Sequence, residues 1–253
     1  MTTGTFTPAP GRAAMRSILR SQVRMELVLT ARRSEAVVLA MGVPLLVLLG
    51  AGLTKATNVP SGDRLGYVVP GVLALTVMST AFTGQAITTG YERSYGVLKR
   101  LGASPLTRPG LIFSKTAAIL CLVALQVLVL AVVGVIVGWR PGFSHVLPAI
   151  GVTVLATAAY CGFALLLAGL LKPETVTGGA TLIYVLMLAA GGIMFAPPDL
   201  GTAGYFLLPL AAHAEALRDT LSDGAAVPGS IWLSLTLWAA AGLALAIRNF
   251  RWE

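Results

Sequence analysis

The chain has 253 residues, of which 56% are hydrophobic and only 11% are charged, and its mean hydropathy is +0.83. A soluble domain carries about 25% charged residues, and its interior could not enclose apolar runs as long as those found here. The composition therefore excludes an ordinary soluble fold and predicts an all-α integral membrane protein. The formal charge of +8 does not indicate nucleic-acid binding, because the basic residues lie beside apolar runs, as they do in the cytoplasmic loops of membrane proteins.

The first 35 residues are polar and rich in arginine, and we expect residues 1–35 to form a cytoplasmic N-terminal segment. Arginine recurs there at every fourth position, which confines the side chains to about one third of a helix circumference. The arginines are Arg12, Arg16, Arg20 and Arg24, and the apolar residues opposite them are Met15, Ile18, Met25 and Leu29. This pattern predicts an amphipathic helix that lies at the membrane interface against anionic lipid. A contact surface for a cytoplasmic partner is a compatible interpretation.

Six stretches that follow are long and apolar enough to cross a bilayer core, which takes about 20 residues in a helix. They are residues 36–53, 66–90, 111–138, 146–171, 176–196 and 229–247. Together they predict a six-span transmembrane domain over 36–248, followed by a short cytoplasmic tail over 249–253. We expect Pro44 to kink the first span. In the overlong third span, we expect Lys115 to extend its amine into the headgroup region.

Basic residues lie mostly on one side of these spans. If both termini are cytoplasmic, fourteen of the eighteen Lys and Arg residues fall on the cytoplasmic side, and only Lys55, Arg64, Arg140 and Arg218 lie elsewhere. Cytoplasmic loops of membrane proteins are enriched in Lys and Arg. We therefore expect a multi-pass protein of the cell (plasma) membrane with both termini in the cytoplasm.

A charged stretch, YERSYGVLKRLGASP, interrupts the apolar sequence between the second and third spans. An acidic residue near its start and basic residues towards its end complement a helix dipole, a glycine suits the position after the helix, and a proline prevents continuation. These residues are Glu92, Lys99, Arg100, Gly102 and Pro105. They predict a short, capped helix over 92–101 that presents Tyr95, Leu98 and Leu101. A rigid element between two spans is suited to receive force from a soluble partner.

Two passages resemble one family. The run YERSYGVLKRLGASPLTRPGLIFSK resembles the first cytoplasmic loop of the type-2 ABC exporter permeases, and LPLAAHAEALRDTLSDG is similar to the passage before their last span. The six-span order and the amphipathic N-terminal helix agree with this family, so the resemblance covers nearly the whole chain. It implies the transmembrane permease subunit of an ATP-driven ABC exporter. Such a subunit forms the translocation path with a second permease subunit (homodimer or heterodimer) and couples to a separate ATP-binding cassette subunit.

The resemblance also implies roles for particular residues. The coupling element that inserts into the ATP-binding subunit would comprise Glu92, Arg93, Tyr95, Gly96, Leu98, Lys99, Arg100, Leu101 and Pro105, beside a connecting helix with Arg12, Arg16, Arg20 and Arg24. Spans two and five would line the pathway, and their polar residues are Thr76, Ser79, Thr80, Thr83, Gln85, Thr177, Thr181 and Tyr184. An outer re-entrant segment before the last span would cap the pathway, and in it Glu215 and Arg218 are spaced to pair.

Other polar and small residues within the spans have plainer interpretations. We favour helix–helix hydrogen bonding for Gln85 and Gln126, although a place in the pathway is the alternative for both. Cys121 and Cys161 lie in apolar runs and are expected to be small buried hydrophobic residues. Gly134 and Gly138 form a GxxxG motif that permits close helix contact.

No G-x-x-x-x-G-K-[ST] sequence occurs in the chain, so we expect ATP and Mg to be bound by the partner subunit. We expect no enzymatic activity, cofactor or metal in this chain, since His145 and His213 are far apart and no catalytic motif accompanies them. The alternative is a secondary transporter or another six-span membrane protein without an ATPase partner. The spans lack the central acidic residue that ion-coupled transport usually uses. Their apolar faces suit an amphipathic drug or lipid-like substrate.

Overall fold

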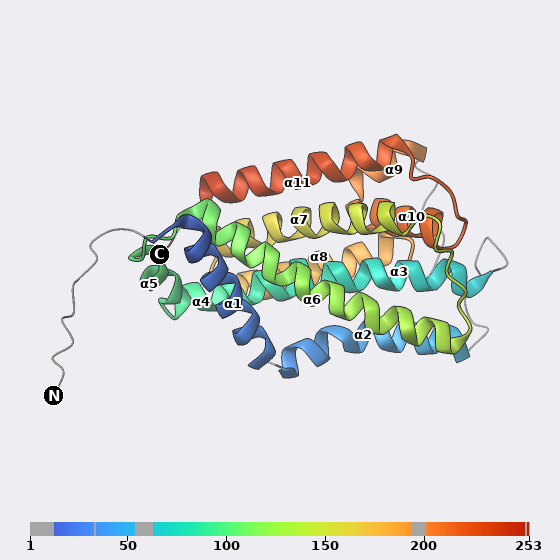
Figure 1. Cartoon of the computed structure of the whole chain (residues 1–253), viewed down its shortest axis with the longest axis horizontal. Helices are drawn as coiled ribbons and strands as arrows, with labels where there is room; N and C mark the ends of the chain where they lie inside the picture. The colour runs from blue at the N-terminus through green and yellow to red at the C-terminus, as the bar shows by residue number, and fades with distance from the viewer. Residues whose placement is uncertain (1–12, 33, 54–62, 194–200, 251, 253) are drawn as a thin grey trace, which may run out of the picture.

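The computed structural model describes residues 13–32, 34–53, 63–193, 201–250 and 252. Within these residues the chain folds into helices and contains no strand, as the composition predicts (Figure 1). The helices are α1 Met15–Arg32, α2 Ser34–Leu53, α3 Arg64–Met78, the π-helix η1 Ser79–Gly84, α4 Gln85–Ser94, α5 Val97–Gly102, α6 Arg108–Val137, α7 Val146–Leu170, α8 Pro173–Ala190, α9 Gly201–Leu207, α10 Pro209–Leu221 and α11 Gly229–Asn249.

Five helical stretches of the described chain are long and apolar enough to cross a membrane. They are the continuous stretch Arg64–Ser94, which joins α3, η1 and α4, and the helices α6, α7, α8 and α11. These correspond to predicted spans two to six. The first predicted span, 36–53, corresponds to α2, of which the described apolar part, Met41–Gly50, is shorter than a span. The helical membrane class is therefore confirmed, while the count of six spans remains a prediction.

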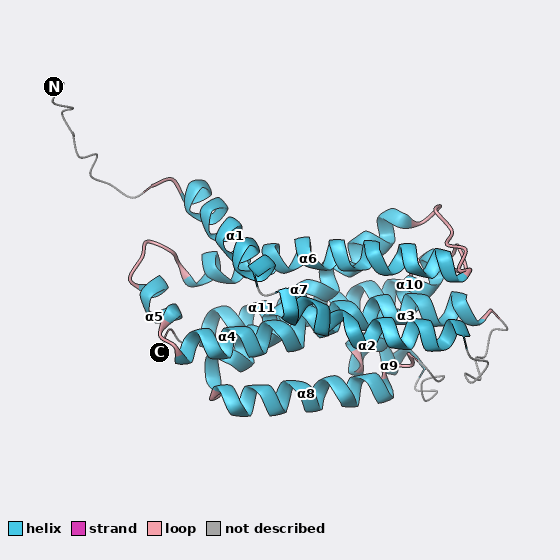
Figure 2. Ribbon diagram, turned by 90° about the horizontal axis from the view of Figure 1, so that it is seen from below, coloured by secondary structure: helices cyan, strands magenta, loops and turns pink. Residues whose placement is uncertain are grey.

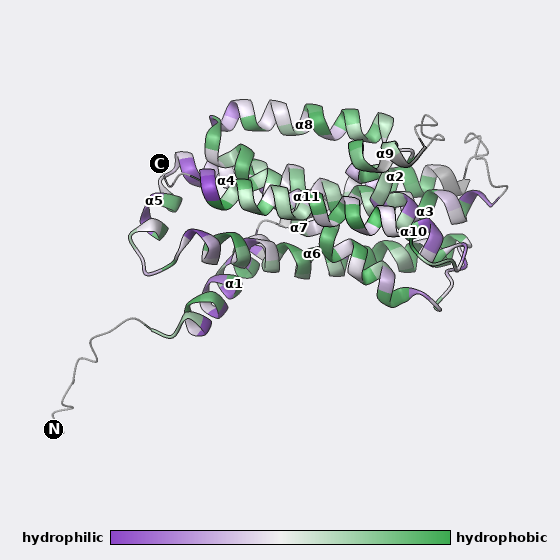
Figure 3. Cartoon of the chain, turned by 90° about the horizontal axis from the view of Figure 1, so that it is seen from above, coloured by the Kyte–Doolittle hydropathy of each residue, from purple (hydrophilic) through white to green (hydrophobic). Residues whose placement is uncertain are grey.

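The long helices run side by side, so the bundle has two ends of different character (Figures 1 and 3). α1, α5 and Trp252 lie at one end, which we call the basic end because Arg16, Arg20, Arg24 and Arg100 are exposed there. α9, α10 and the start of α3 lie at the other end, which we call the α10 end. Figure 2 shows α8 along one side of the bundle, and most of its side chains are uncovered.

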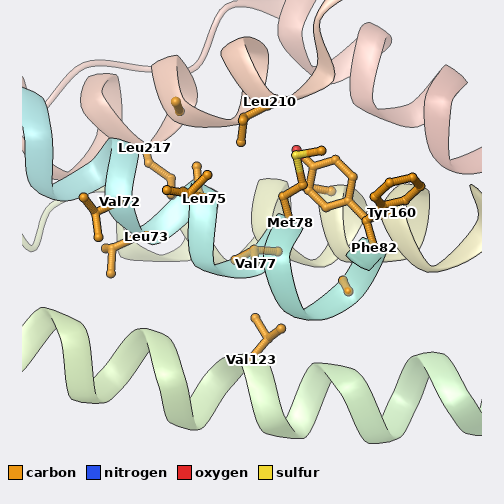
Figure 4. Packing of buried hydrophobic residues seen from close by; sticks show 14 of the residues in the cluster. Val72, Leu73, Leu75, Val77, Met78, Phe82, Val123, Tyr160, Leu210 and Leu217 are labelled. Atoms are coloured by element: carbon orange, nitrogen blue, oxygen red, sulfur yellow. The ribbon is translucent and has the colours of Figure 1, made fainter. Parts of the chain in front are cut away.

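α3 is the centre of the bundle. Every residue from Gly66 to Met78 is buried, and α2, α6, α7 and α10 all pack against this helix. Figure 4 shows Leu210 and Leu217 of α10 and Val123 of α6 among the side chains that enclose it. α3 is therefore covered by other helices of the protein on most of its circumference, unlike α8, which is largely uncovered.

The central stretch is longer than the apolar part of a membrane. Its 31 residues extend over about 46 Å, whereas a bilayer core is about 30 Å thick. The π-helix η1 continues α3 into α4 without a break. The last turns of α4 therefore reach the basic end, and they carry Glu92 and Arg93 there.

Glycines bring neighbouring helices into backbone contact. A Cβ atom placed on Gly162 of α7 would lie 2.6 Å from the backbone nitrogen of Leu243, and one on Gly242 of α11 would lie 3.0 Å from a backbone oxygen of α7. In the GxxxG motif, Gly134 alone makes such an approach: a Cβ atom there would lie 3.0 Å from the Val69 side chain of α3, whereas Gly138 lies after the end of α6. Small residues allow membrane helices to approach closely and increase their van der Waals contact.

Candidate functional site

The charged stretch 91–105 contains two helices instead of the single predicted helix over 92–101. α4 continues through Glu92 to Ser94, and α5 begins at Val97. Between them Gly96 has a φ of 71°, in the left-handed region that favours glycine. The N–H of Gly96 donates to the carbonyl oxygen of Arg93 at 3.0 Å, which ends α4. The prediction that Glu92 begins the short helix is wrong, because the glycine turn starts it five residues later.

The position of α5 depends on packing, because six residues are too few for an isolated helix to be stable in water. Leu98 is fully buried in a group that we call the anchor cluster. The cluster has Leu98, Leu106, Leu111 and Phe250 at its centre, with Ile18, Leu19, Leu101 and Trp252 around them. Leu98 is therefore a packing residue and not the exposed docking residue that the sequence predicted, because the one apolar face of so short a helix is covered by the protein itself.

The opposite side of this region is exposed. Tyr95 is 73% exposed, and its ring stacks on that of Tyr91 with the ring centroids 6.1 Å apart. We call the exposed surface the docking face; it comprises Tyr91, Tyr95, Val97, Lys99 and Arg100. Leu101 is half-buried, and Pro105 is exposed beyond the end of α5. The docking face combines aromatic, aliphatic and basic groups from the end of α4, the turn and α5.

Arg93 connects α4 to the end of α7. Its guanidinium donates to the carbonyl oxygens of Ala168 and Leu171, each at 3.2 Å. The last carbonyl groups of a helix have no donor within the helix, so Arg93 satisfies two of these acceptors. Its side chain therefore serves a helix–helix contact next to the docking face.

Three charged side chains meet in the interior beside α5. The Lys115 ammonium of α6 donates to the Glu92 carboxylate of α4 at 2.7 Å and to the Glu26 carboxylate of α1 at 3.0 Å. Only 1% of the Lys115 side chain is exposed. A buried charge is tolerated only where it is paired and hydrogen-bonded. We call this arrangement the ion triad, and it ties α1, α4 and α6 together at one depth.

The ion triad corrects the prediction that Lys115 extends to the lipid headgroups. α6 begins at Arg108, two turns earlier than Lys115, and α1 packs across this part of it. The lysine is therefore covered by protein. Sequence reasoning missed Glu26 altogether, although one signal was present: on a helical wheel Glu26 falls between Ile18 and Leu19, two apolar residues.

α1 is a helix of 18 residues with an exposed basic side. Arg16, Arg20 and Arg24 are exposed, and Ile18 and Leu29 on the other side are half-buried. Met15 and Met25 are exposed, although they were predicted to lie on the apolar side. Arg12 lies outside the described residues. The amphipathic pattern is present, and the contact with lipid remains a prediction.

The predicted pathway residues lie on helices that pack together, since α8 contacts both η1 and α4. Several of their polar groups bond within the protein: Thr80 donates to Gln126 of α6 at 2.7 Å, Gln85 donates to Thr89, Thr76 to the carbonyl of Val72, and Thr177 to that of Pro173. Ser79, Thr83 and Tyr184 are half-buried, and Thr181 is exposed. The hydrogen bond from Thr80 makes Gln126 a helix–helix contact. A role in the pathway stays a prediction for the polar residues of spans two and five.

At the α10 end, Arg218 is buried among acceptors. Its guanidinium donates to Glu215 at 2.9 Å, to the carbonyl of Tyr67 at 3.1 Å and to the carbonyl of Gly192 at 2.6 Å. It also lies 3.7 Å from the centre of the Tyr67 ring, in a cation–π contact. The pairing expected of Glu215 and Arg218 is present, and the same arginine fixes α10 to α3 and to the segment after α8.

Next to Arg218, Asp219 is half-buried and one of its carboxylate oxygens has no hydrogen-bond partner within the described chain. The pKa of Asp219 is raised to about 6: burial contributes most, the neighbouring carboxylates of Glu215 and Asp223 add to the increase, and Arg218 opposes it. The carboxyl group is therefore held in an environment that favours its neutral form.

Residues 18–222 match the sequence model of the ABC-2 type transporter. The chain belongs to this family. The match extends from α1 to the end of α10 and so includes the ion triad, the docking face and Arg218. A search of curated proteins finds no match. Membership makes this ABC-2 chain a transport component of a membrane.

The described residues of this ABC-2 chain contain no group of three His, Cys, Asp or Glu residues placed to bind a metal ion. Cys121 is exposed on α6, contrary to the expectation that it is buried, whereas Cys161 is buried in α7. His213 of α10 is buried beside Tyr160, and its Nε2 lies 3.3 Å from the hydroxyl of Thr153. Cys161 and His213 therefore contribute to helix packing.

The ion triad predicts that removing its cation is costly. Lys115→Met removes the cation that balances two buried carboxylates, and the expected loss of stability is about 3–5 kcal/mol. The measurement is thermal unfolding of the purified chain in detergent. Adding Glu26→Gln and Glu92→Gln to the same chain should restore most of the loss, because no buried charge then remains. Lys172→Met, at an exposed lysine, is the control; a Lys115→Met protein as stable as this control would contradict the assignment.

The raised pKa of Asp219 predicts a pH dependence of stability. The folded chain binds this proton more tightly than the unfolded chain, so the contribution is most favourable below pH 4 and is lost as the pH rises towards 6. Asp219→Asn should therefore raise Tm at pH 8 relative to the parent, and the gain should shrink at pH 4. Glu174→Gln, at an exposed carboxylate of α8, serves as the control. An equal effect of Asp219→Asn at both pH values would show that ionisation of Asp219 is not responsible.

Proposed function

We propose that this chain is the membrane-spanning subunit of an ATP-driven exporter and that separate ATP-binding cassette subunits dock on its α5. One observation carries the proposal: α5 is held rigidly by the anchor cluster while its docking face is left exposed. The chain itself lacks a P-loop, so ATP and Mg would be bound and hydrolysed by the partner.

The orientation follows from charge. The basic end carries the exposed arginines of α1 together with Lys99 and Arg100, and basic residues flanking spans mark the cytoplasmic side. The ATP-binding subunits would therefore meet the basic end in the cytoplasm, and the α10 end would face outward. If α2 is the first span, the chain has six spans and both termini lie in the cytoplasm. The membrane would be the plasma membrane.

Motion of the partner would be transmitted through contacts described above. A displacement of the docking face would be transmitted to α1 and the start of α6 through the anchor cluster, because Leu98 shares this cluster with Leu19 and Leu111. The ion triad then joins α1, α4 and α6, and Arg93 joins α4 to α7. A displacement of α5 would thus tilt several spans together.

A second permease subunit would complete the pathway, with the spans around η1 and α8 on its lining. α8 supports this placement because its side chains are mostly uncovered while it carries threonines at positions 175, 177 and 181. Polar groups in spans normally face protein or a cavity rather than lipid. The apolar character of the remaining faces favours an amphipathic drug or lipid-like substrate over a long anionic polymer. At the outer end, α10 would cap the path through Arg218.

The docking face predicts that reversing one of its charges weakens binding of the ATP-binding subunit. Arg100→Glu should reduce co-purification of the partner at least about tenfold, since a like-charge contact at an interface costs several kcal/mol, and should lower ATPase activity in proteoliposomes. Arg140→Glu makes the same charge change at an exposed arginine outside the basic end, and it should leave both quantities unchanged.

Three outcomes of this experiment can be told apart. Loss of the partner with Arg100→Glu alone supports the proposal. Equal binding by both variants would contradict the docking face. A wild-type chain that transports substrate at the expense of an ion gradient, and that recruits no ATP-binding protein, would favour the secondary transporter instead.

A further inference from the structure

The last residues of the chain lie beyond the family match, which ends at residue 222. α11 ends at Asn249, where the N–H of Phe250 donates to the carbonyl of Ala246 at 2.9 Å and the backbone becomes extended. Phe250 is fully buried. Its ring meets that of Trp252 edge to face, with centroids 5.8 Å apart and the planes at 89°, an arrangement that aromatic pairs prefer.

This aromatic pair packs directly on α5. Phe250 is in the centre of the anchor cluster with Leu98, and Trp252 packs at its margin. Gly102, in the last turn of α5, receives the indole: a Cβ atom there would lie 3.1 Å from Cδ2 and 3.2 Å from Cγ of Trp252. The sequence indicated Gly102 as the residue after the helix, but it lies within α5, where the missing side chain makes room for Trp252.

Phe250 and Trp252 supply the packing that α5 lacks by itself. α5 is too short to be stable alone, and Gly96 at its start contributes no side-chain contact. At the basic end, burial of apolar groups from water stabilises a contact, as it does in a soluble protein, whereas helices within the bilayer gain little from it. Phe250 and Trp252 therefore fix α5 from the side of α11, while Ile18 and Leu19 fix it from the side of α1.

We propose that Phe250 and Trp252 are positioning residues of the coupling helix. They hold α5 in the orientation in which the docking face meets its partner, and they carry a displacement of α5 directly to α11. Along the chain, α11 follows α5 only after α6, α7, α8, α9 and α10. The role in coupling rests on the proposed function; the packing of the pair on α5 does not.

The first arm of the test measures α5 itself, in the full-length chain in lipid nanodiscs. Trp252→Ala should speed hydrogen exchange of the amides of residues 97–102 at least about tenfold, because local opening of a helix follows its loss of packing. Trp238→Ala removes a half-buried tryptophan in the middle of α11 and should leave α5 unchanged. If α5 exchanges at the same rate in the Trp252→Ala chain and the parent, the pair does not position α5 and the proposal fails.

The second arm measures coupling, with the co-expressed ATP-binding subunit and MgATP as the probe. Trp252→Ala should weaken binding of that subunit about tenfold or more, and Trp252→Phe, which keeps an aromatic ring, should restore most of it. Gly102→Ala should weaken binding in the parent but add nothing to Trp252→Ala, because its added methyl group acts only against the indole.

The outcomes of the two arms are distinct. Faster exchange with unchanged partner binding would overturn the positioning role, and independent effects of Gly102→Ala and Trp252→Ala would do the same. A parent chain that binds no ATP-binding subunit would overturn the proposed function together with the coupling role. In that case the exchange arm still decides whether the pair holds α5.

Discussion

The arrangement of the basic end depends on one buried cation. Lys115 satisfies two carboxylates, Glu26 and Glu92, that come from helices 89 and 23 residues away in the sequence. Because a buried charge without a partner is far more costly than an exposed one, the three helices are fixed at one relative height. The turn at Gly96 follows four residues after Glu92, so the height of α4 also sets where α5 begins. The docking face is therefore placed by an electrostatic constraint in the interior, and the anchor cluster then sets its tilt.

Each end of the molecule contains a buried cation, and the two cations are stabilised by different groups. At the basic end the buried cation is balanced by carboxylates, which join three separate helices. At the α10 end, Arg218 is balanced mainly by backbone carbonyls of Tyr67 and Gly192 and by one carboxylate. Backbone carbonyls hold the guanidinium by directional hydrogen bonds, so α10 is fixed to the ends of α3 and α8. Between these ends the helices meet through apolar and small residues, as at Gly162 and Gly242, and through single side-chain hydrogen bonds such as that from Thr80 to Gln126.

Some of this could be predicted from the sequence and some could not, for identifiable reasons. Hydropathy located five helical stretches because each depends on composition over about 20 residues, and the spacing of Glu215 and Arg218 revealed their pairing because both lie on one helix. The ion triad, by contrast, depends on contacts across long sequence separations, and Lys115 beside an apolar span resembles any lysine that reaches the headgroups. Leu98 was assigned to the surface because an isolated amphipathic helix does not reveal which face its own protein covers. The break at Gly96 was missed because the acidic and basic residues around it suit one helix as well as two.

If an ATP-binding partner docks as proposed, α1, α5 and the start of α6 move as one body when that partner binds ATP. Electron spin resonance distances between labels would test it most directly, in a chain without Cys121 and Cys161, diluted with unlabelled subunits. One pair would join Ser21 of α1 to Ala103 beside α5, and a second would join Ala103 to Ala225 at the α10 end; residues 21, 103 and 225 are all exposed. On addition of ATP and vanadate, the first distance should stay within about 2 Å and the second should change by several ångströms, as expected for rigid-body motion. A change in the first distance while the second stays constant would contradict the claim.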